Sequence, residues 1–133
     1  MRVVLDTNVL VSGILTKGTS RKILDIWYDR KFDLIVGPEI FQEYHRVLFE
    51  INGRYNLDVD ISEILATIGT KAIWISPISL IDQICDDPDD DKFIAAAISG
   101  NAQFVVTGDK ALLRVGSIAG ADIITPSQFI NNF

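Results

Sequence analysis

The sequence predicts a three-layer α/β domain in which helices cover both faces of a mainly parallel β-sheet. Short apolar runs rich in β-branched residues alternate along the chain with longer segments whose apolar residues recur at helical spacing. Strands that are apolar throughout are typical of parallel sheets covered on both faces, and their alternation with helices is typical of such domains. The chain has 133 residues, 48% of them hydrophobic, which fits a single domain over residues 1–133.

The first part of the chain predicts a β-α-β unit. Residues 2–5 form one short, mostly apolar run, and residues 32–36 form the next. Between them, Thr19 or Ser20 can cap a helix, because a side-chain oxygen at this position accepts a hydrogen bond from a free backbone N–H. The apolar stripe of this helix consists of Ile23, Leu24, Ile26 and Trp27.

Two further helices are predicted after this unit. The first begins at Pro38, since proline is favoured at the first position of a helix. Its apolar residues recur at helical spacing and are Ile40, Phe41, Tyr44, Val47, Leu48 and Ile51. The second is capped within Asp58–Asp60 or by Ser62, and it ends near Gly69.

The second half of the chain predicts three more strands and a helix that follows a run of acids. The strands cover residues 72–75, 104–107 and 122–125. The helix begins within Asp89–Asp91 and ends at Gly100, since glycine commonly terminates helices. One helical turn is predicted at each of residues 110–113 and 126–129.

Acidic residues stand at the ends of the predicted strands. Asp6 directly follows the first strand, and Asp109 follows strand 104–107 after one glycine. Ligands of such folds bind beyond the carboxyl ends of the strands. The helix that begins near Asp91 leads into strand 104–107, so three acids can converge there. Glu43 borders the apolar stripe of the second predicted helix, where it either meets a partner or packs its stem while its head reaches water.

The acidic run from Asp86 to Asp91 carries five aspartates in six positions. Like charges at this density repel, so either a cation faces them or the run is solvated and caps the following helix. Carboxylates without Cys or His partners suit Mg²⁺ or Mn²⁺, which take oxygen ligands. The single Cys85 and the single His45 exclude a Cys/His zinc site and a ribonuclease mechanism built on two imidazoles.

At this point the chain resembles the PIN-domain ribonucleases. Four acidic motifs of that family are matched in order by D-T-N-V-L from Asp6, by Glu43, by D-P-D-D-D-K-F-I-A-A-A around Asp91 and by V-V-T-G-D ending at Asp109. The resemblance is closest to the toxins of bacterial and archaeal toxin-antitoxin pairs. It implies a five-stranded sheet of order 3-2-1-4-5, endoribonuclease activity on RNA that depends on Mg²⁺ or Mn²⁺, an antitoxin partner and frequent homodimers.

The resemblance also implies roles for individual residues. The metal-binding and catalytic acids would be Asp6, Glu43, Asp91 and Asp109. Their polar support would come from Thr7, Asn8 and Thr107. Within the acidic run, Asp91 is preferred because it stands three residues before I-A-A, as the third acid of the family does. The roles of Asp89 and Asp90 stay open, and either residue could contact the metal-binding acids without binding the ion itself.

Two other functions stay open at this stage. A haloacid-dehalogenase-like phosphatase also uses an aspartate after its first strand, but it needs a second acid two residues later, where this chain has Asn8. A PIN-like module without turnover would instead bind RNA or a protein partner. The presence of all four acids argues against that second alternative.

The formal net charge of −6 argues against a nucleic-acid-binding protein unless bound metal neutralises the acidic run. The basic residues expected to contact RNA phosphates are Lys17, Arg21 and Lys22, and their alternative role is an ordinary solvated helix face. Asp6 and Asn8 interrupt the apolar N-terminal stretch, so no signal peptide or membrane span is expected. A cytoplasmic location is therefore predicted.

Overall fold

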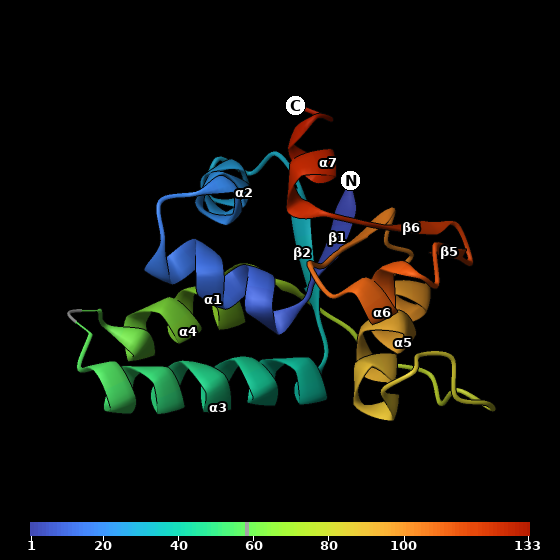
Figure 1. Ribbon diagram of the computed structural model, residues 1–133, viewed down its shortest axis with the longest axis horizontal. Coiled ribbons are helices and arrows are strands. Elements are labelled where there is room, and N and C mark those ends of the chain that lie inside the picture. Colours follow the sequence, from blue (N-terminus) through green and yellow to red (C-terminus); the bar gives the residue numbers. More distant parts are fainter. Residues whose placement is uncertain (58) are drawn as a thin grey trace.

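The structure, a computed structural model, describes residues 1–57 and 59–133. Figure 1 shows the elements in their order along the chain. They are β1 (Arg2–Leu5), α1 (Thr7–Leu15), α2 (Thr19–Tyr28), β2 (Asp33–Val36), α3 (Pro38–Tyr55), α4 (Ile61–Lys71), β3 (Ile73–Trp74), the 3₁₀ turn η1 (Pro88–Asp90), α5 (Asp91–Ser99), β4 (Phe104–Val106), α6 (Lys110–Leu113), β5 (Ser117–Ile118), β6 (Ala121–Ile124) and α7 (Pro126–Ile130). Asp58, one of the predicted caps, lies outside the described residues. Asp60 caps α4 by accepting a hydrogen bond from the Glu63 N–H at 3.1 Å.

The described strands form a six-stranded sheet in the order β3-β2-β1-β4-β6-β5. Neighbouring strands run parallel, except that β5 and β6 run antiparallel. The predicted five-strand order is confirmed, with β6 as the fifth predicted strand. The extra strand β5 was not predicted, because it is only two residues long and joins β6 through a tight turn. In that turn Ala119 and Gly120 have φ angles of +49° and +85°.

Helices cover both faces of the sheet. In Figure 1, α1 to α4 lie on one side of β1 and β2, and α5 and α6 lie on the other. Helix α5 contacts β1, β2 and β4, while α1 packs against α2 and α3. The prediction of a three-layer α/β fold with a mainly parallel sheet is confirmed.

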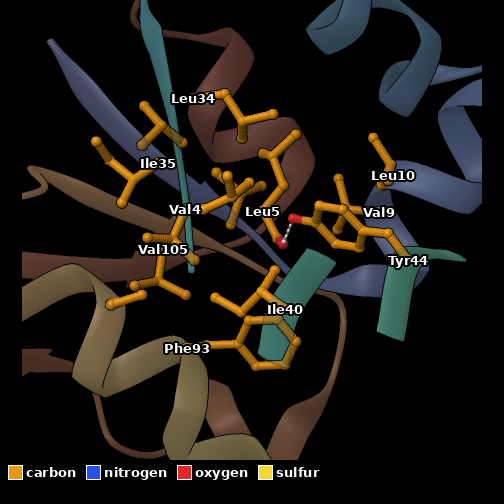
Figure 2. Close-up of a cluster of buried hydrophobic side chains, with 14 of the residues drawn as sticks. Val4, Leu5, Val9, Leu10, Leu34, Ile35, Ile40, Tyr44, Phe93 and Val105 are labelled. Atoms are coloured by element: carbon orange, nitrogen blue, oxygen red, sulfur yellow. Dashed lines mark hydrogen bonds between the residues drawn. The ribbon is translucent and has the colours of Figure 1, made fainter. Parts of the chain in front are cut away.

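The core is centred on β1, whose residues from Val3 to Leu5 are completely buried. Figure 2 shows the side chains of Val4 and Leu5 packed among those of β2, α3 and α5. Tyr44 of α3 is also fully buried, and its hydroxyl donates a hydrogen bond to the Leu5 carbonyl at 2.5 Å. Burial raises the pKa of the Tyr44 hydroxyl, so it remains a donor at neutral pH. This bond fixes α3 to the end of β1 and so holds Glu43 beside Asp6.

Helix α1 was not predicted from the sequence. Its buried residues spread around most of the helix instead of forming one stripe, because α1 is covered by both α2 and α3. Gly13 allows the close approach to α2. A Cβ added there would lie 2.8 Å from both Leu24 Cδ1 and the Ser20 carbonyl oxygen. The positions of α1 and its neighbours therefore depend on a small residue at this contact.

Several observed boundaries differ from the predicted ones by one or two residues, and the largest differences lie around β3. Helix α4 continues past Gly69 to Lys71, because a glycine inside a helix weakens it without ending it. The strand predicted at residues 72–75 is correspondingly shorter and covers only Ile73 and Trp74.

Candidate functional site

Asp6 lies at the carboxyl end of β1 and at the N-terminus of α1. Its backbone N–H donates to the Val106 carbonyl at 2.9 Å, which extends the pairing of β1 with β4. The Thr107 hydroxyl donates to Asp6 Oδ2 at 2.6 Å, and both residues are buried. Burial raises the pKa of the Asp6 carboxyl, and the Thr107 hydroxyl opposes this shift. The negative charges of Glu43 and Asp109 raise the pKa further, so Asp6 is a buried acid that faces two others.

Asp109 lies beyond the end of β4, at the same edge of the sheet. Its backbone N–H donates to Thr107 Oγ1 at 3.0 Å. Its carboxylate caps α6 by accepting a hydrogen bond from the Ala111 N–H at 3.0 Å. A single hydroxyl, that of Thr107, therefore links Asp6 to Asp109. The structure brings these two acids together at the edge where the strands end.

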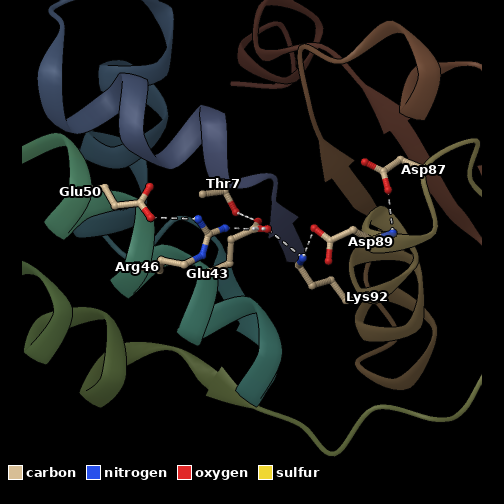
Figure 3. A network of polar contacts seen from close by, with 7 residues as sticks. All are labelled: Thr7, Glu43, Arg46, Glu50, Asp87, Asp89 and Lys92. Atoms are coloured by element: carbon tan, nitrogen blue, oxygen red, sulfur yellow. Dashed lines mark hydrogen bonds and ion pairs between the residues drawn. The ribbon is translucent and has the colours of Figure 1, made fainter.

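Glu43 projects from α3 toward the same place, and both of its carboxylate oxygens have partners (Figure 3). The Thr7 hydroxyl donates to Oε2. Lys92 Nζ lies 2.8 Å from Oε1, and Arg46 Nη2 lies 3.9 Å from the same oxygen. The side chain of Glu43 is only 15% exposed. It is therefore a largely buried carboxylate with its own counter-charge, in contrast to Asp6.

Lys92 is a site residue that the sequence analysis did not assign. Its side chain is 9% exposed and its ammonium bridges Glu43 and Asp89, with 2.9 Å to Asp89 Oδ2. Burial lowers the pKa of Lys92, but the hydrogen bonds to Glu43 and Asp89 outweigh burial and raise it overall. The ammonium therefore stays charged at neutral pH. The sequence does contain a sign of this role, since Lys92 directly follows three aspartates and stands one helical turn after Asp89.

Asp90 is the residue of the acidic run whose pKa is raised by burial and by the negative charges of Asp6 and Asp109. Its pKa is raised to about 6, first by burial and then by the charges of Asp6, Asp87 and Asp109, while Lys92 lowers it. The sequence alone leaves its role open. In the structure it belongs to the group of mutually repelling acids at this edge of the sheet.

Asp91, the preferred acid of the sequence analysis, is engaged elsewhere. Its carboxylate accepts a hydrogen bond from the Cys85 N–H at 2.7 Å and bonds from the Ile84 N–H at 3.1 and 3.3 Å. Burial raises the pKa of the Asp91 carboxyl, but these hydrogen bonds prevail and lower it. Asp91 thus fastens the preceding loop to the start of α5. Among the described residues, no contact joins Asp91 to Asp6 or Asp109, whereas Asp90 is the acid of the run whose pKa burial and their charges raise.

The remaining polar residues lie around this group. Asp87 caps η1 by accepting a hydrogen bond from the Asp89 N–H at 2.9 Å (Figure 3). The hydrogen bond from Lys92 lowers the pKa of Asp89, which is exposed. Asn8 is also exposed, in the first turn of α1. Helix capping therefore accounts for Asp87. This agrees with the alternative interpretation of the acidic run, in which the aspartates cap the following helix.

The basic residues expected to contact RNA differ in their surroundings. Arg21 donates from Nε to the Gly13 carbonyl at 2.6 Å and from Nη2 to the Ile14 carbonyl at 2.9 Å. It therefore satisfies carbonyls at the C-terminal end of α1, which have no partners within the helix. Lys17 and Lys22 are exposed.

The donor set suits a hard divalent cation. Asp6, Asp90 and Asp109 supply carboxylate oxygens, and the raised pKa values of Asp6 and Asp90 reflect burial and repulsion that a cation would relieve. Within residues 1–57 and 59–133, no three His, Cys, Asp or Glu side chains already stand at the spacing of a finished ion site. The chemistry of the residues therefore fits Mg²⁺ or Mn²⁺.

Comparison with known proteins adds one match. A family model described as PIN domain matches residues 2–111, from β1 into α6, and this range includes all the acids discussed above. No curated protein matches the chain. Among the described residues, no helix is both long and apolar enough to cross a membrane.

Proposed function

Because the chain belongs to the PIN-domain family, whose members are generally nucleases, we propose that it is a ribonuclease that hydrolyses RNA phosphodiester bonds with Mg²⁺ or Mn²⁺ bound. The observation that carries this proposal is the grouping of Asp6, Asp90 and Asp109 at one sheet edge without a basic side chain bonded to any of them among the described residues. Family membership argues against the haloacid-dehalogenase-like phosphatase.

A divalent ion at this place would activate a water molecule and stabilise the phosphate oxygens during an in-line displacement that leaves a 5′-phosphate and a 3′-hydroxyl. Asp6, Asp90 and Asp109 would hold the ion. Thr107 would keep Asp6 and Asp109 in place, because its hydroxyl bonds to both residues. Glu43 would border the ion from α3, with its position set by Thr7 and Lys92.

In this proposal Asp90 takes the role first assigned to Asp91. The reason is that the Asp91 carboxylate is already occupied by two backbone N–H groups, whereas the charge of Asp90 faces those of Asp6 and Asp109. Asp91 then acts as a positioning residue, since it holds the loop before α5 against that helix.

Cleavage of a fluorogenic single-stranded RNA by the purified protein tests the proposal. We expect cleavage in Mn²⁺ or Mg²⁺ and none in EDTA. D6N and D90N should each lower the rate at least about 100-fold, since each removes a charge from the ion site. D91N, assayed well below its melting temperature, should retain much more activity than D90N. Wild-type rates in D90N would return the role to Asp91, and the absence of metal-dependent cleavage would support the binding module without turnover.

We also propose that the protein is the toxin of a toxin-antitoxin pair, with an antitoxin as partner and a homodimer as its working form. The support is the resemblance of its four motifs to that group. Induced expression in bacteria should stop growth, and D6N should abolish this effect. Co-expression of a small protein encoded beside this gene should restore growth. Continued growth during expression of active enzyme would argue against the toxin role, and light scattering would report the oligomeric state.

Lys17 and Lys22 are the proposed phosphate contacts outside the metal site, because both are exposed near the end of α1 and the start of α2. Replacing both with alanine should weaken the binding of unrelated RNAs about equally and flatten its dependence on salt, with metal affinity unchanged. An unaltered salt dependence would assign them to a solvated helix face. Arg21 is unsuited to this test, since its guanidinium caps α1.

A further inference from the structure

Lys92 places a positive charge beside the candidate metal site, on the two acids Glu43 and Asp89 that border it. Its side chain is largely buried at the start of α5, and its ammonium contacts Glu43 at 2.8 Å and Asp89 at 2.9 Å (Figure 3). With Thr7 bonded to the other oxygen, the Glu43 carboxylate has no oxygen without a partner. Glu43 is thus neutralised from within the protein, whereas no basic side chain of the described residues bonds to Asp6 or Asp109.

This arrangement matters for the number of ions the site can take. In two-metal sites the ions lie about 3.5 to 4 Å apart and share carboxylates between them. A second ion at Glu43 would have to displace the Lys92 ammonium or lie against it, and a cation is repelled strongly by a buried like charge. Lys92 cannot easily swing away, because its stem is buried and leaving would strand the largely buried Glu43 without its partner.

Lys92 is also poorly placed to contact RNA. Its side chain is 9% exposed and both of its contacts are carboxylates, whereas the neighbouring Arg46 is 59% exposed and lies 3.9 Å from Glu43. Arg46 is therefore the more exposed of the two positive charges. The role of Lys92 is therefore directed at the acids of the site.

We propose that the Lys92 ammonium takes the place of a second divalent ion, so that the protein binds a single Mg²⁺ or Mn²⁺ at Asp6, Asp90 and Asp109. This inference rests on the proposed function, because it presupposes that these acids bind a divalent ion. It adds the stoichiometry of the cofactor and assigns Lys92 as the positioning residue that sets it.

Counting bound Mn²⁺ by electron paramagnetic resonance, on chelator-treated protein titrated to millimolar Mn²⁺, tests the proposal. The wild type should bind one ion per chain. K92M keeps an apolar stem of similar length but removes the charge, so it should bind two. R46M is the matched control, since it also removes a positive charge near Glu43 but leaves Lys92 in place, and it should bind one. The double variant K92M/E43Q should return to one, because the second ion would lose the carboxylate that holds it.

Each outcome has a definite meaning. Two ions in the wild type overturn the inference without any substitution, so the test does not depend on the folding of K92M. A folded K92M, checked by circular dichroism, that binds one ion with wild-type affinity also overturns it, as does a second ion in R46M. No bound ion in the wild type would instead refute the metal site of the proposed function.

Discussion

Substitution of Asp90 and Asp91 by asparagine should change the stability of the metal-free protein in opposite directions. The pKa of Asp90 is raised from its ordinary 3.8 to about 6 by burial and by neighbouring acids. The pKa of Asp91 is lowered, since hydrogen bonds from Cys85 and Ile84 outweigh its burial. At neutral pH the charge on Asp90 therefore opposes folding, while the charge on Asp91 favours it.

The magnitude for Asp90 follows from proton linkage. The unfolded chain loses this proton near pH 3.8 and the folded chain holds it to about pH 6, so the unfavourable contribution grows across that window and is complete above it. A rise of the pKa from 3.8 to about 6 corresponds to about 3 kcal/mol, and we expect about 1 kcal/mol after allowing for the partial exposure of the side chain. D90N should therefore raise the free energy of unfolding by about 1 kcal/mol at neutral pH and by almost nothing near pH 4.

The expectation for Asp91 has the opposite sign and pH dependence. Because its folded pKa is lowered, its stabilising contribution is present above the ordinary pKa and is lost as the pH falls through the folded value. D91N replaces a charged acceptor by a neutral amide and leaves at least one backbone N–H less well satisfied. We expect a loss of about 1 to 2 kcal/mol at neutral pH.

The assay is urea denaturation in EDTA, followed through the fluorescence of the buried Trp27, at about pH 4 and about pH 7.5. The wild type and both variants are compared at each pH. Stabilisation by D90N that is present only at the higher pH would support the reasoning. Destabilisation by D90N at about pH 7.5, or equal stabilisation by both variants, would refute the assignment of these two acids.

Three further predictions concern the ion and the packing around it. Millimolar Mn²⁺ should raise the melting temperature of the wild type by mass action and should raise that of D90N much less. Equal shifts would show that Asp90 does not bind the ion. T107V removes the hydroxyl that bonds to Asp6 and should weaken Mn²⁺ binding at least about tenfold in calorimetry, whereas T107S should restore it. Unchanged Mn²⁺ affinity in T107V would show that the Thr107 hydroxyl does not support the ion site. G13A should lower the free energy of unfolding by about 1 to 3 kcal/mol in urea denaturation, because its Cβ would meet atoms 2.8 Å away. G53A, with nothing within 4 Å in α3, is its control and should be neutral or stabilising.

The sequence predicted the sheet well because each central strand is a short, mostly apolar run that ends at a polar residue or a turn residue: Asp6 after β1, Gly37 after β2 and Thr107 after β4. Asp6 and Asp109 could be assigned to one edge of the sheet on this basis alone, since parallel strands end together. Helix α1 escaped prediction for the opposite reason. It is covered on several sides, so its apolar residues form no stripe, and its sequence resembles a continuation of the apolar strand.

The choice among the acids of the run depended on geometry that spacing does not reveal. Asp89, Asp90 and Asp91 are consecutive, and which of them faces Asp6 depends on where η1 ends and α5 begins. That boundary is tied to the fold of the preceding loop, because the backbone amides of Ile84 and Cys85 capture the Asp91 carboxylate. The contact between loop and helix therefore determines which carboxylate of the run the loop captures, and the order of the residues does not reveal it.

The same geometry explains how the site tolerates its negative charge without metal. The acids divide into two groups: Glu43 and Asp89 share the buried ammonium of Lys92, while Asp6 and Asp90 are left with raised pKa values. A divalent cation is attracted most strongly to carboxylates that have no positive partner. Asp6 and Asp90 should therefore contribute more to its binding free energy than Glu43 and Asp89. An ion there would also lower the repulsion that opposes folding. Metal binding and stability should therefore be coupled through Asp6 and Asp90, and hardly at all through Glu43.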